Sequence, residues 1–224
     1  MKSAILLIDL FFLLIPLLFL MGRSALTFRQ LIFGAVPALV TTVIFTEMAV
    51  FWAGLKVISF NSAYLVDAYY RLLPLEYYLF IFSFIYMALA IYEWLNVKYP
   101  DNELQKYSLA ISNGVLGICV AFLFFGYTKW YTVVIFGFLL LLLFFIEYKN
   151  LLRFMYRFYR TFLLCLLPFL GFYIFFSNSA LNHNIAENTG YLVLNMPLES
   201  VFMLMGMLLL TVSVSEFIKS RTIK

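Results

Sequence analysis

Seven apolar runs constrain the fold more than any other feature of this sequence. Each is roughly 20 residues long, which is enough for an α-helix to cross a hydrocarbon layer of about 30 Å. Such a segment has to be helical in lipid, because its backbone N–H and C=O groups find no water there. The sequence therefore predicts an all-α integral membrane protein with seven transmembrane helices. The runs are Ala4–Met21, Leu31–Ala53, Glu76–Leu95, Ser108–Phe125, Trp130–Ile146, Thr161–Phe176 and Glu199–Ile218.

Composition supports this class and excludes a water-soluble domain. The 224 residues are 65% hydrophobic and 12% charged, and their mean hydropathy is +1.00. Too few polar side chains remain to cover an ordinary aqueous surface. The first run follows Met1 and Lys2 as the core of a signal peptide would. Its length and the lack of a small-residue cleavage site predict a retained helix instead.

The distribution of Lys and Arg predicts the orientation in the membrane, because basic residues are retained on the cytoplasmic side. Eleven of the fifteen basic residues fall in connections on one side of the predicted helices. We therefore expect a multi-pass protein of the plasma (inner) membrane with its N-terminus outside and its C-terminus in the cytoplasm. This topology explains the net charge of +4 without a nucleic-acid partner, and basic clusters predict contacts with lipid headgroups. The four basic residues on the outer side are Lys2, Lys56, Arg71 and Lys129.

The chain contains an internal repeat. A shift of 123 positions superposes Pro74 on Pro197, Glu76 on Glu199 and Glu93 on Glu216. The shift predicts two three-helix repeats, residues 1–97 and 127–224, joined by a linker helix within residues 98–126. One helix between two three-helix units makes both run the same way across the membrane. We expect the repeats to be related by an axis near the membrane normal.

Each repeat has a Pro-Leu-Glu segment at the start of an apolar run, preceded by an asparagine thirteen residues before the proline. Taken singly, Pro-x-Glu is a common helix opening, since proline suits the first helical position and a carboxylate complements the helix dipole. Its repetition in register indicates a site, whose two glutamates we expect to face each other across the repeat interface on the outer side. The segments are Pro74–Glu76 and Pro197–Glu199, and the asparagines are Asn61 and Asn184.

Two further acids, Asp9 and Glu47, lie within apolar runs. A carboxylate inside a membrane is costly, so each is a functional hypothesis by default. The predicted direction in which each helix crosses the membrane places both acids in the outer half of the membrane, with Glu76 and Glu199. For Asp9, an interfacial residue that reaches water is an equally good interpretation. Glu93 and Glu216 lie about 25 Å further along their helices, where we expect structural or headgroup contacts.

Several classes of site are disfavoured by the residues that are missing. A retinal-binding protein needs a lysine midway along its last helix, and Lys219 lies at the end of the last run. A zinc hydrolase needs several imidazole or carboxylate ligands, whereas His183 is the single histidine. Cys119 and Cys165 fall in apolar runs, where a thiol behaves as a small hydrophobe. The sequence therefore predicts no metal, and without a Gly-rich dinucleotide motif it predicts no flavin or other cofactor.

Aromatic side chains make up 21% of the chain and are frequent beside Glu76, where Tyr77 and Phe80 follow it. Ring faces stabilise cations. Aromatic rings beside an acid therefore suit proton-initiated chemistry on an alkene.

At these residues the chain resembles the membrane-embedded lycopene cyclase family, in which two three-helix subunits, separate or fused in tandem, form one carotenoid cyclase. The resemblance implies ring closure at the linear ends of lycopene, without net redox change or a flavin. The first matching segment contains Phe60, Asn61, Tyr64, Leu65, Leu73–Glu76, Leu79, Phe80, Tyr86, Tyr92 and Glu93. The second contains Asn184, Glu187, Asn188, Gly190, Pro197, Glu199, Phe202 and Glu216.

The chain departs from the family pattern at four positions. A second acid usually follows each glutamate, and Tyr77 and Ser200 stand there instead; Leu192 replaces a usual arginine and Asp67 a usual glycine. The alternatives to a lycopene β-cyclase are a noncatalytic carotenoid- or isoprenoid-binding paralogue and a cyclase for a different end group.

The predicted site combines three acids with binding residues for a lipophilic carotenoid or isoprenoid substrate that dissolves in membrane lipid. One carboxyl group donates a proton to a terminal double bond, and a base removes a ring proton after closure. The predicted catalytic residues are Glu76, Glu199 and Glu47. The predicted substrate-binding residues are Asn61, Pro74, Tyr77, Phe80, Asn184, Pro197 and Phe202.

Overall fold

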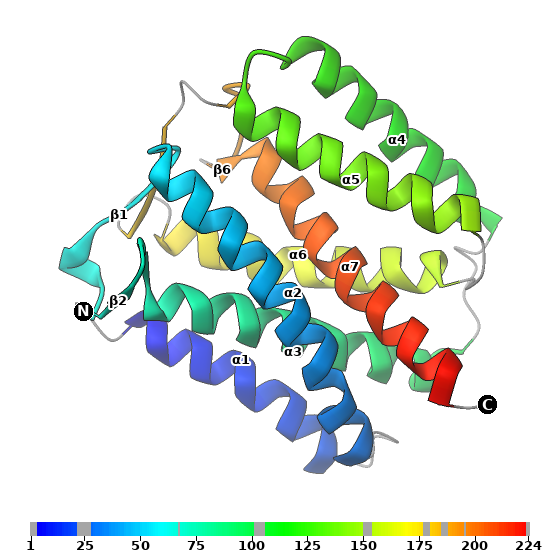
Figure 1. Ribbon diagram of the computed structural model, residues 1–224. Coiled ribbons are helices and arrows are strands. Elements are labelled where there is room, and N and C mark those ends of the chain that lie inside the picture. The colour runs from blue at the N-terminus through cyan, green and yellow to red at the C-terminus, as the bar shows by residue number, and fades with distance from the viewer. Residues whose placement is uncertain are drawn as a thin grey trace. The chain divides into compact units, whose positions relative to one another are not determined.

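The computed structural model describes residues 4–21, 28–66, 68–100, 106–149, 154–176, 180–184, 188–194 and 196–222. Seven α-helices dominate this described part of the chain (Figure 1), which confirms the prediction of an all-α protein. They are α1 (Ala4–Met21), α2 (Phe28–Gly54), α3 (Leu75–Lys98), α4 (Ser108–Phe125), α5 (Trp130–Lys149), α6 (Met155–Phe176) and α7 (Leu198–Thr222).

The helices follow the apolar runs closely, and α6 differs most from its prediction. It begins at Met155, six residues before the predicted Thr161. Its first turns alternate basic residues with buried rings such as Phe158 and Phe162. Hydropathy alone misses a helical turn in which arginines interrupt the apolar pattern, although a one-sided apolar face is enough to hold a helix.

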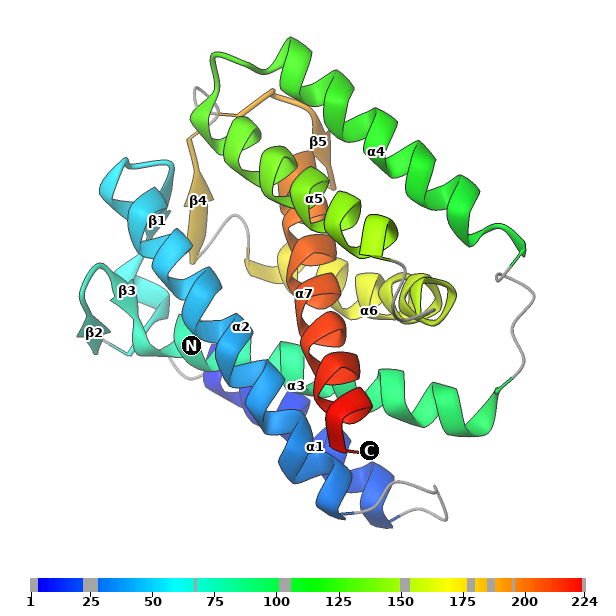
Figure 2. The same cartoon turned by 45° about the vertical axis from the view of Figure 1, so that its right-hand side comes forward.

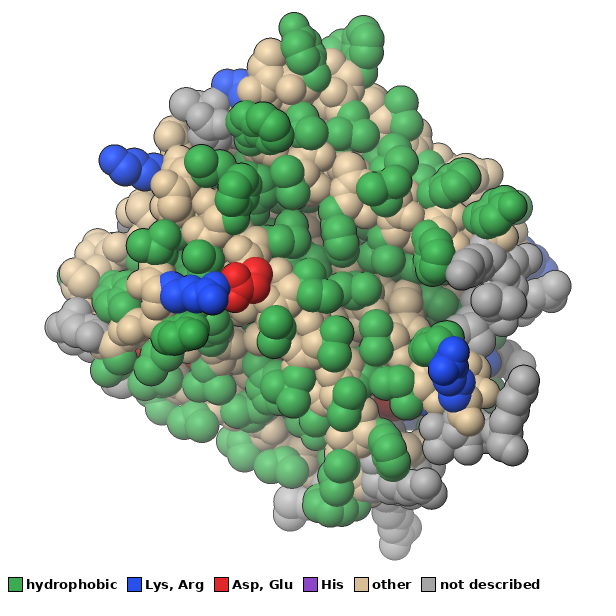
Figure 3. Space-filling view, viewed as in Figure 1, with side chains coloured by type: hydrophobic (Ala, Val, Ile, Leu, Met, Phe, Trp, Pro, Cys, Tyr) green, Lys and Arg blue, Asp and Glu red, His purple; other side chains and the backbone are tan. Residues whose placement is uncertain are grey.

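Six of these helices are long and apolar enough to cross a membrane, judged by length and composition over the described residues. The apolar stretch of α1 is shorter, at Ile5–Phe19, so the seventh span stays a prediction. Hydrophobic side chains are spread over the whole face in Figure 3, and charged ones are few there. A surface of this kind suits lipid rather than water.

The first of two compact units comprises residues 1–100 and 175–183. Its central helix is α3, which packs against both α1 and α2 (Figures 1 and 2). Most of α3 is therefore buried, and Phe84, Ile85 and Tyr92 are among its least exposed side chains. Gly34 on α2 permits close approach, because a Cβ there would lie 3.3 Å from a Leu89 methyl carbon.

The second unit comprises residues 101–174 and 184–224. Here α5 packs against both α4 and α7 (Figure 2). The rings of Phe122 and Phe136 stack at the α4–α5 contact with centroids 4.6 Å apart. Within the same unit, the Tyr159 hydroxyl on α6 lies 2.7 Å from Ser112 Oγ on α4.

Short strands precede α3 and α7, in identical registers in the two copies of the repeat. Hairpins form between β2 (Tyr69–Tyr70) and β3 (Leu73–Pro74), and between β5 (Leu192–Val193) and β6 (Met196–Pro197). The 123-residue shift carries the first hairpin onto the second, residue for residue. The repeat in the sequence is therefore also a repeat of local backbone structure.

A further pair of strands joins two repeat-equivalent segments. β1 (Ile58–Phe60) pairs antiparallel with β4 (Leu181–His183), and Ser59 lies opposite Asn182 at the centre. The 123-residue shift also carries β1 onto β4, so the strand pair has local two-fold symmetry. A 3₁₀ turn, η1 (Ser62–Tyr64), follows β1 and leads towards the first hairpin.

Candidate carboxylate sites

The two hairpins fix where α3 and α7 begin, and so where the buried glutamates lie. Pro74 ends β3 in an extended conformation, with φ −67° and ψ 148°, and is the N-cap of α3. The backbone N–H of Leu75 then donates to Ala68 O at 2.9 Å, and Leu198 donates to Tyr191 O at the same distance. Each proline thus precedes the helix, whereas the Pro-x-Glu pattern favoured the first helical position. The strand pairing of the proline is the reason for the difference.

Glu76 is buried in the first turn of α3, with 2% of its surface exposed. The backbone N–H of Val66 donates to its Oε1 at 2.5 Å. Its Oε2 is also buried, and no described residue hydrogen-bonds to it. Asp9 lies on α1, which packs against α3, and is fully buried. Asp9 is therefore not the water-exposed interfacial residue that was one interpretation of the sequence.

Glu199 occupies the equivalent place at the start of α7 and is also fully buried. Its Oε1 accepts three hydrogen bonds, from Thr132 Oγ1 at 2.8 Å, from the Thr189 N–H at 2.8 Å and from Thr189 Oγ1 at 2.9 Å. Its Oε2 receives none from the residues that the structure describes. Oε1 therefore accepts all the hydrogen bonds, and Oε2 is available to a proton or a ligand.

Aromatic rings pack together one turn beyond Asp9 and Glu76. Phe12, one turn after Asp9 on α1, packs edge-on against Phe84 with centroids 5.4 Å apart. Phe12 also lies 6.3 Å from the ring of Phe80, one turn after Glu76. In the second unit, the ring of Phe202 lies 4.8 Å from that of Phe136. Each glutamate is thus followed by an aromatic contact within its own unit.

The residues directly after the glutamates make uncharged contacts. The ring of Tyr77 packs edge-on against Phe60 at 5.2 Å. Ser200 is fully buried, and its Oγ lies 3.4 Å from the hydroxyls of both Tyr131 and Tyr173. Neither position supplies a second acid.

Glu47 is the predicted catalytic acid with the most exposed setting. It lies on α2 and forms an ion pair with Arg71, whose Nη1 is 2.6 and 2.7 Å from its two oxygens. The hydrogen bond to Glu47 is the main reason that the pKa of Arg71 is raised. Both side chains are about half exposed, at 57% for Glu47 and 48% for Arg71. The pair connects α2 to the turn of the first hairpin.

The two predicted binding asparagines, Asn61 and Asn184, lie in the loops that precede the hairpins. Asn61 caps η1, because its Oδ1 accepts a hydrogen bond from the Ala63 N–H at 3.1 Å. Its own backbone N–H donates to Ala180 O at 3.0 Å. Asn184 directly follows β4 and is exposed. Asn61 therefore stabilises the turn that precedes Val66.

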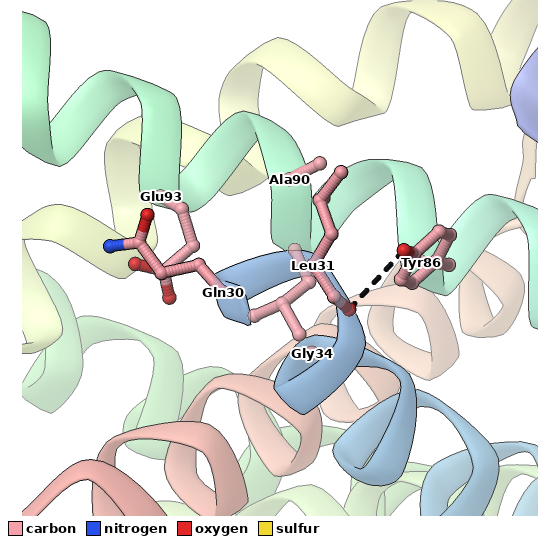
Figure 4. A pocket seen from close by; sticks show the side chains of 7 residues that line it. Gln30, Leu31, Gly34, Tyr86, Ala90 and Glu93 are labelled. Carbon is pink, nitrogen blue, oxygen red and sulfur yellow. Dashed lines mark hydrogen bonds between the residues drawn. The ribbon is translucent and has the colours of Figure 1, made fainter. Parts of the chain in front are cut away.

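The glutamates at the far ends of α3 and α7 belong to other surroundings. Glu216 pairs with Lys219 at 2.8 Å. Glu93 lines a small pocket between α2 and α3, where Tyr86 donates to Leu31 O at 3.2 Å (Figure 4). Figure 4 shows the side chain of Gln30 directed towards Glu93. These contacts suit the expected structural role of the two acids.

Sequence reasoning missed four hydrogen-bond donors to the glutamates, which come from Val66, Thr132 and Thr189. The repeat shift relates these positions, because it superposes Val66 on Thr189 and Asp9 on Thr132, but it does not place them beside the glutamates. Among the described residues, no group of three or more His, Cys, Asp or Glu side chains is arranged to hold a metal ion.

Comparison with known proteins agrees with this arrangement. A family model described as lycopene cyclase matches residues 2–95 and 128–218, which together make up most of the chain. No curated protein and no solved structure matches the chain. The match covers both Pro-Leu-Glu segments and both buried glutamates. The chain therefore belongs to the lycopene cyclase family and is carotenoid cyclase-like in general function.

Proposed function

We propose that this protein is a membrane enzyme that closes a β-ring at a linear end group of lycopene, without net oxidation or reduction. The observation that carries the proposal is the pair of buried glutamates, Glu76 and Glu199, each held by an equivalent backbone N–H at the start of a helix. Carotenoids dissolve in the bilayer, so an apolar membrane protein meets them there. We further propose that the N-terminus is outside and the C-terminus cytoplasmic.

The proposed reaction begins with proton transfer from a carboxyl group to the terminal double bond. The O–H bond breaks, a C–H bond forms at the less substituted carbon, and a tertiary cation remains. The next suitable double bond gives its electron pair to the new ring bond, which moves the cation into the ring. A carboxylate then removes a ring proton and leaves a new double bond. Product and substrate are isomers, because one proton enters and one leaves.

Glu76 and Glu199 are the proposed groups for these two proton transfers. Each keeps one carboxyl oxygen free of hydrogen bonds from the described residues, so that oxygen is available to a proton or substrate. Exclusion of water matters, because water would capture the carbocation. The rings of Phe80 and Phe202 are proposed to bind the end group and to stabilise positive charge. Asn61, Asn184 and the two prolines are proposed to shape the loops at this end.

For Glu47 we propose a positioning role in place of the catalytic one. Both oxygens of its carboxylate already accept hydrogen bonds from Arg71 Nη1. The pair is about half exposed, whereas a proton donor to an alkene needs a site that excludes water. The ion pair instead holds the turn before α3.

The test is expression in bacteria that accumulate lycopene, followed by chromatography of the pigments. We expect cyclised pigment with the unmodified protein. Glu76→Gln and Glu199→Gln should each lower its yield by roughly 100-fold or more, the usual contribution of general acid–base catalysis. Glu216→Gln is the matched control, because it removes a carboxylate from α7 at the far end. Unchanged lycopene with the protein present in the membrane would contradict the proposal.

A noncatalytic carotenoid-binding protein is the second candidate. It is favoured by Tyr77 and Ser200, which make uncharged contacts where the family usually has acids. In that case lycopene would copurify with the protein unchanged, and the glutamine variants would alter pigment binding without any change in its chemistry.

A further inference from the structure

We propose that Asp9 carries the proton of the first unit and donates it in a hydrogen bond to the Glu76 carboxylate, which makes this pair the acid that starts ring closure. The position of the proton is argued from burial, from the hydrogen-bond donors of the first unit and from the equivalent residues of the second. Its use in catalysis rests on the proposed function.

The two copies of the repeat bring the same two positions together. In the second unit, Thr132 on α5 donates directly to Glu199 on α7 at 2.8 Å. Asp9 is the residue 123 positions before Thr132, and it lies on α1, which packs against α3 as α5 packs against α7. The ring of Phe12, one turn after Asp9, lies 6.3 Å from that of Phe80, one turn after Glu76, as this equivalence requires. A hydroxyl donor in the second copy is therefore replaced by a carboxyl group in the first.

The hydrogen-bond donors around the pair show which carboxyl group holds the proton. Glu76 accepts the Val66 N–H and lies in the first turn of α3, where the helix dipole favours a negative charge. Asp9 lies within α1, and neither of its buried oxygens receives a hydrogen bond from the described residues. Two neighbouring charges buried without solvent are costly. A proton on Asp9 removes one charge and supplies the donor that Glu76 Oε2 lacks.

The proton can then move in two short steps. Asp9 first gives its proton to the Glu76 carboxylate, so that one O–H bond breaks and another forms. Glu76 then gives this proton to the alkene, so that its O–H bond breaks as a C–H bond forms. The pair ends with two carboxylates beside a carbocation, whose positive charge compensates for the second negative one. The proton that leaves the ring replaces the one that the carboxyl groups gave to the alkene. Asp9 is thus a positioning residue and proton reservoir, and Glu76 is the group that touches the substrate.

Infrared spectroscopy of the purified protein tests where the proton is, without any need for activity. At neutral pH we expect a carboxylic acid C=O band that shifts in D₂O. The band should disappear in Asp9→Asn and should remain in Glu76→Gln and in the control Glu216→Gln. Absence of the band from the unmodified protein, or its persistence in Asp9→Asn, would overturn the assignment.

The pigment assay tests the catalytic half separately. Asp9→Asn should lower the yield of cyclised pigment by roughly 100-fold, as Glu76→Gln does, and Asp9→Glu should restore part of it. Asp9→Thr repeats the hydroxyl of the second unit and should be as inactive as Asp9→Asn, since it donates a hydrogen bond but no acidic proton. Full yield from Asp9→Asn would overturn the role of Asp9 in the acid. If the unmodified protein gives no cyclised pigment but the infrared pattern holds, the proposed function fails and the proton assignment stands.

Discussion

The two carboxylate sites have the same backbone and different side chains. Each glutamate follows a hairpin of two-residue strands, and each accepts a hydrogen bond from the backbone N–H of the residue ten positions earlier. Around Glu199 the remaining donors are threonine hydroxyls, whereas the first unit has the carboxyl group of Asp9 in place of Thr132. The repeated backbone thus fixes the position of each acid, and a few exchanged side chains set its chemistry.

The largest expected difference between the two sites is in stability after removal of each acid. Glu199→Leu leaves three donors without an acceptor, whereas Glu76→Leu leaves the Val66 N–H and the O–H proposed for Asp9. We expect losses of about 2–4 kcal/mol for Glu199→Leu and about 1–2 kcal/mol for Glu76→Leu. Reversible unfolding in mixed detergent micelles measures both. The corresponding glutamine variants keep an acceptor and should lose about half as much. Equal losses for the two leucine variants would contradict the difference between the sites.

A second contrast lies in the paired strands, where His183 is the repeat equivalent of Phe60. Burial lowers the pKa of His183 to about 4, from 6.5 in the unfolded chain. Between these values the unfolded chain binds more protons, so the contribution of His183 to stability is complete above pH 6.5 and is lost as the pH falls towards 4.

The size of this loss is roughly 2–3 kcal/mol over that range. His183→Phe puts the residue of the first copy in the second and should remove this part of the pH dependence. Unfolding curves of both proteins at several pH values test it. The same slope in both would show that His183 does not stay neutral in the folded chain.

Exchange of the residues ten positions before the glutamates should make the two sites more alike. Thr189→Val removes one hydroxyl donor from Glu199, with an expected cost of about 1 kcal/mol. Val66→Thr places a hydroxyl at the equivalent position beside Glu76, which accepts the Val66 N–H. We expect it to be neutral or slightly stabilising. Unfolding in micelles measures each variant, and a larger loss from Val66→Thr than from Thr189→Val would reverse the comparison.

The smallest expected effect is at the hairpin turns. Arg71 and Leu194 have nearly the same positive φ, 53° and 52°, which strains residues other than glycine. Arg71 gains an ion pair with Glu47, and Leu194 is an exposed apolar residue. Leu194→Gly should therefore stabilise the chain by about 0.5 kcal/mol, while Arg71→Gly should gain less or lose stability. A thermal shift in detergent compares the pair at low and high salt, and salt should affect the Arg71 variant more.

Much of the fold could be predicted from the sequence, because hydropathy, prolines and the repeat are local or periodic signals. The limits of α1 and α4 follow directly from their apolar runs. The full burial of Asp9 could not be predicted in the same way. The helix α1 is apolar on all sides, so its sequence does not indicate which face meets α3.

The hairpins and the ion pair were missed for different reasons. Strands of two residues are too short for an alternating pattern, and the turn positions Arg71 and Leu194 lack the glycine or asparagine that marks such turns. The ion pair of Glu47 and Arg71 joins residues far apart in sequence. Orientation in the membrane and the limits of the repeats stay predictions.

Isotope uptake during cyclisation tests whether ring closure begins with a proton transfer. Membranes that contain the protein are incubated with lycopene in H₂O or in D₂O, and the cyclised pigment is analysed by mass spectrometry. Proton-initiated closure predicts a product of the same mass as lycopene in H₂O, which gains one non-exchangeable deuterium for each ring formed in D₂O. A cyclised product without deuterium, or one that has lost hydrogen relative to lycopene, would contradict the account.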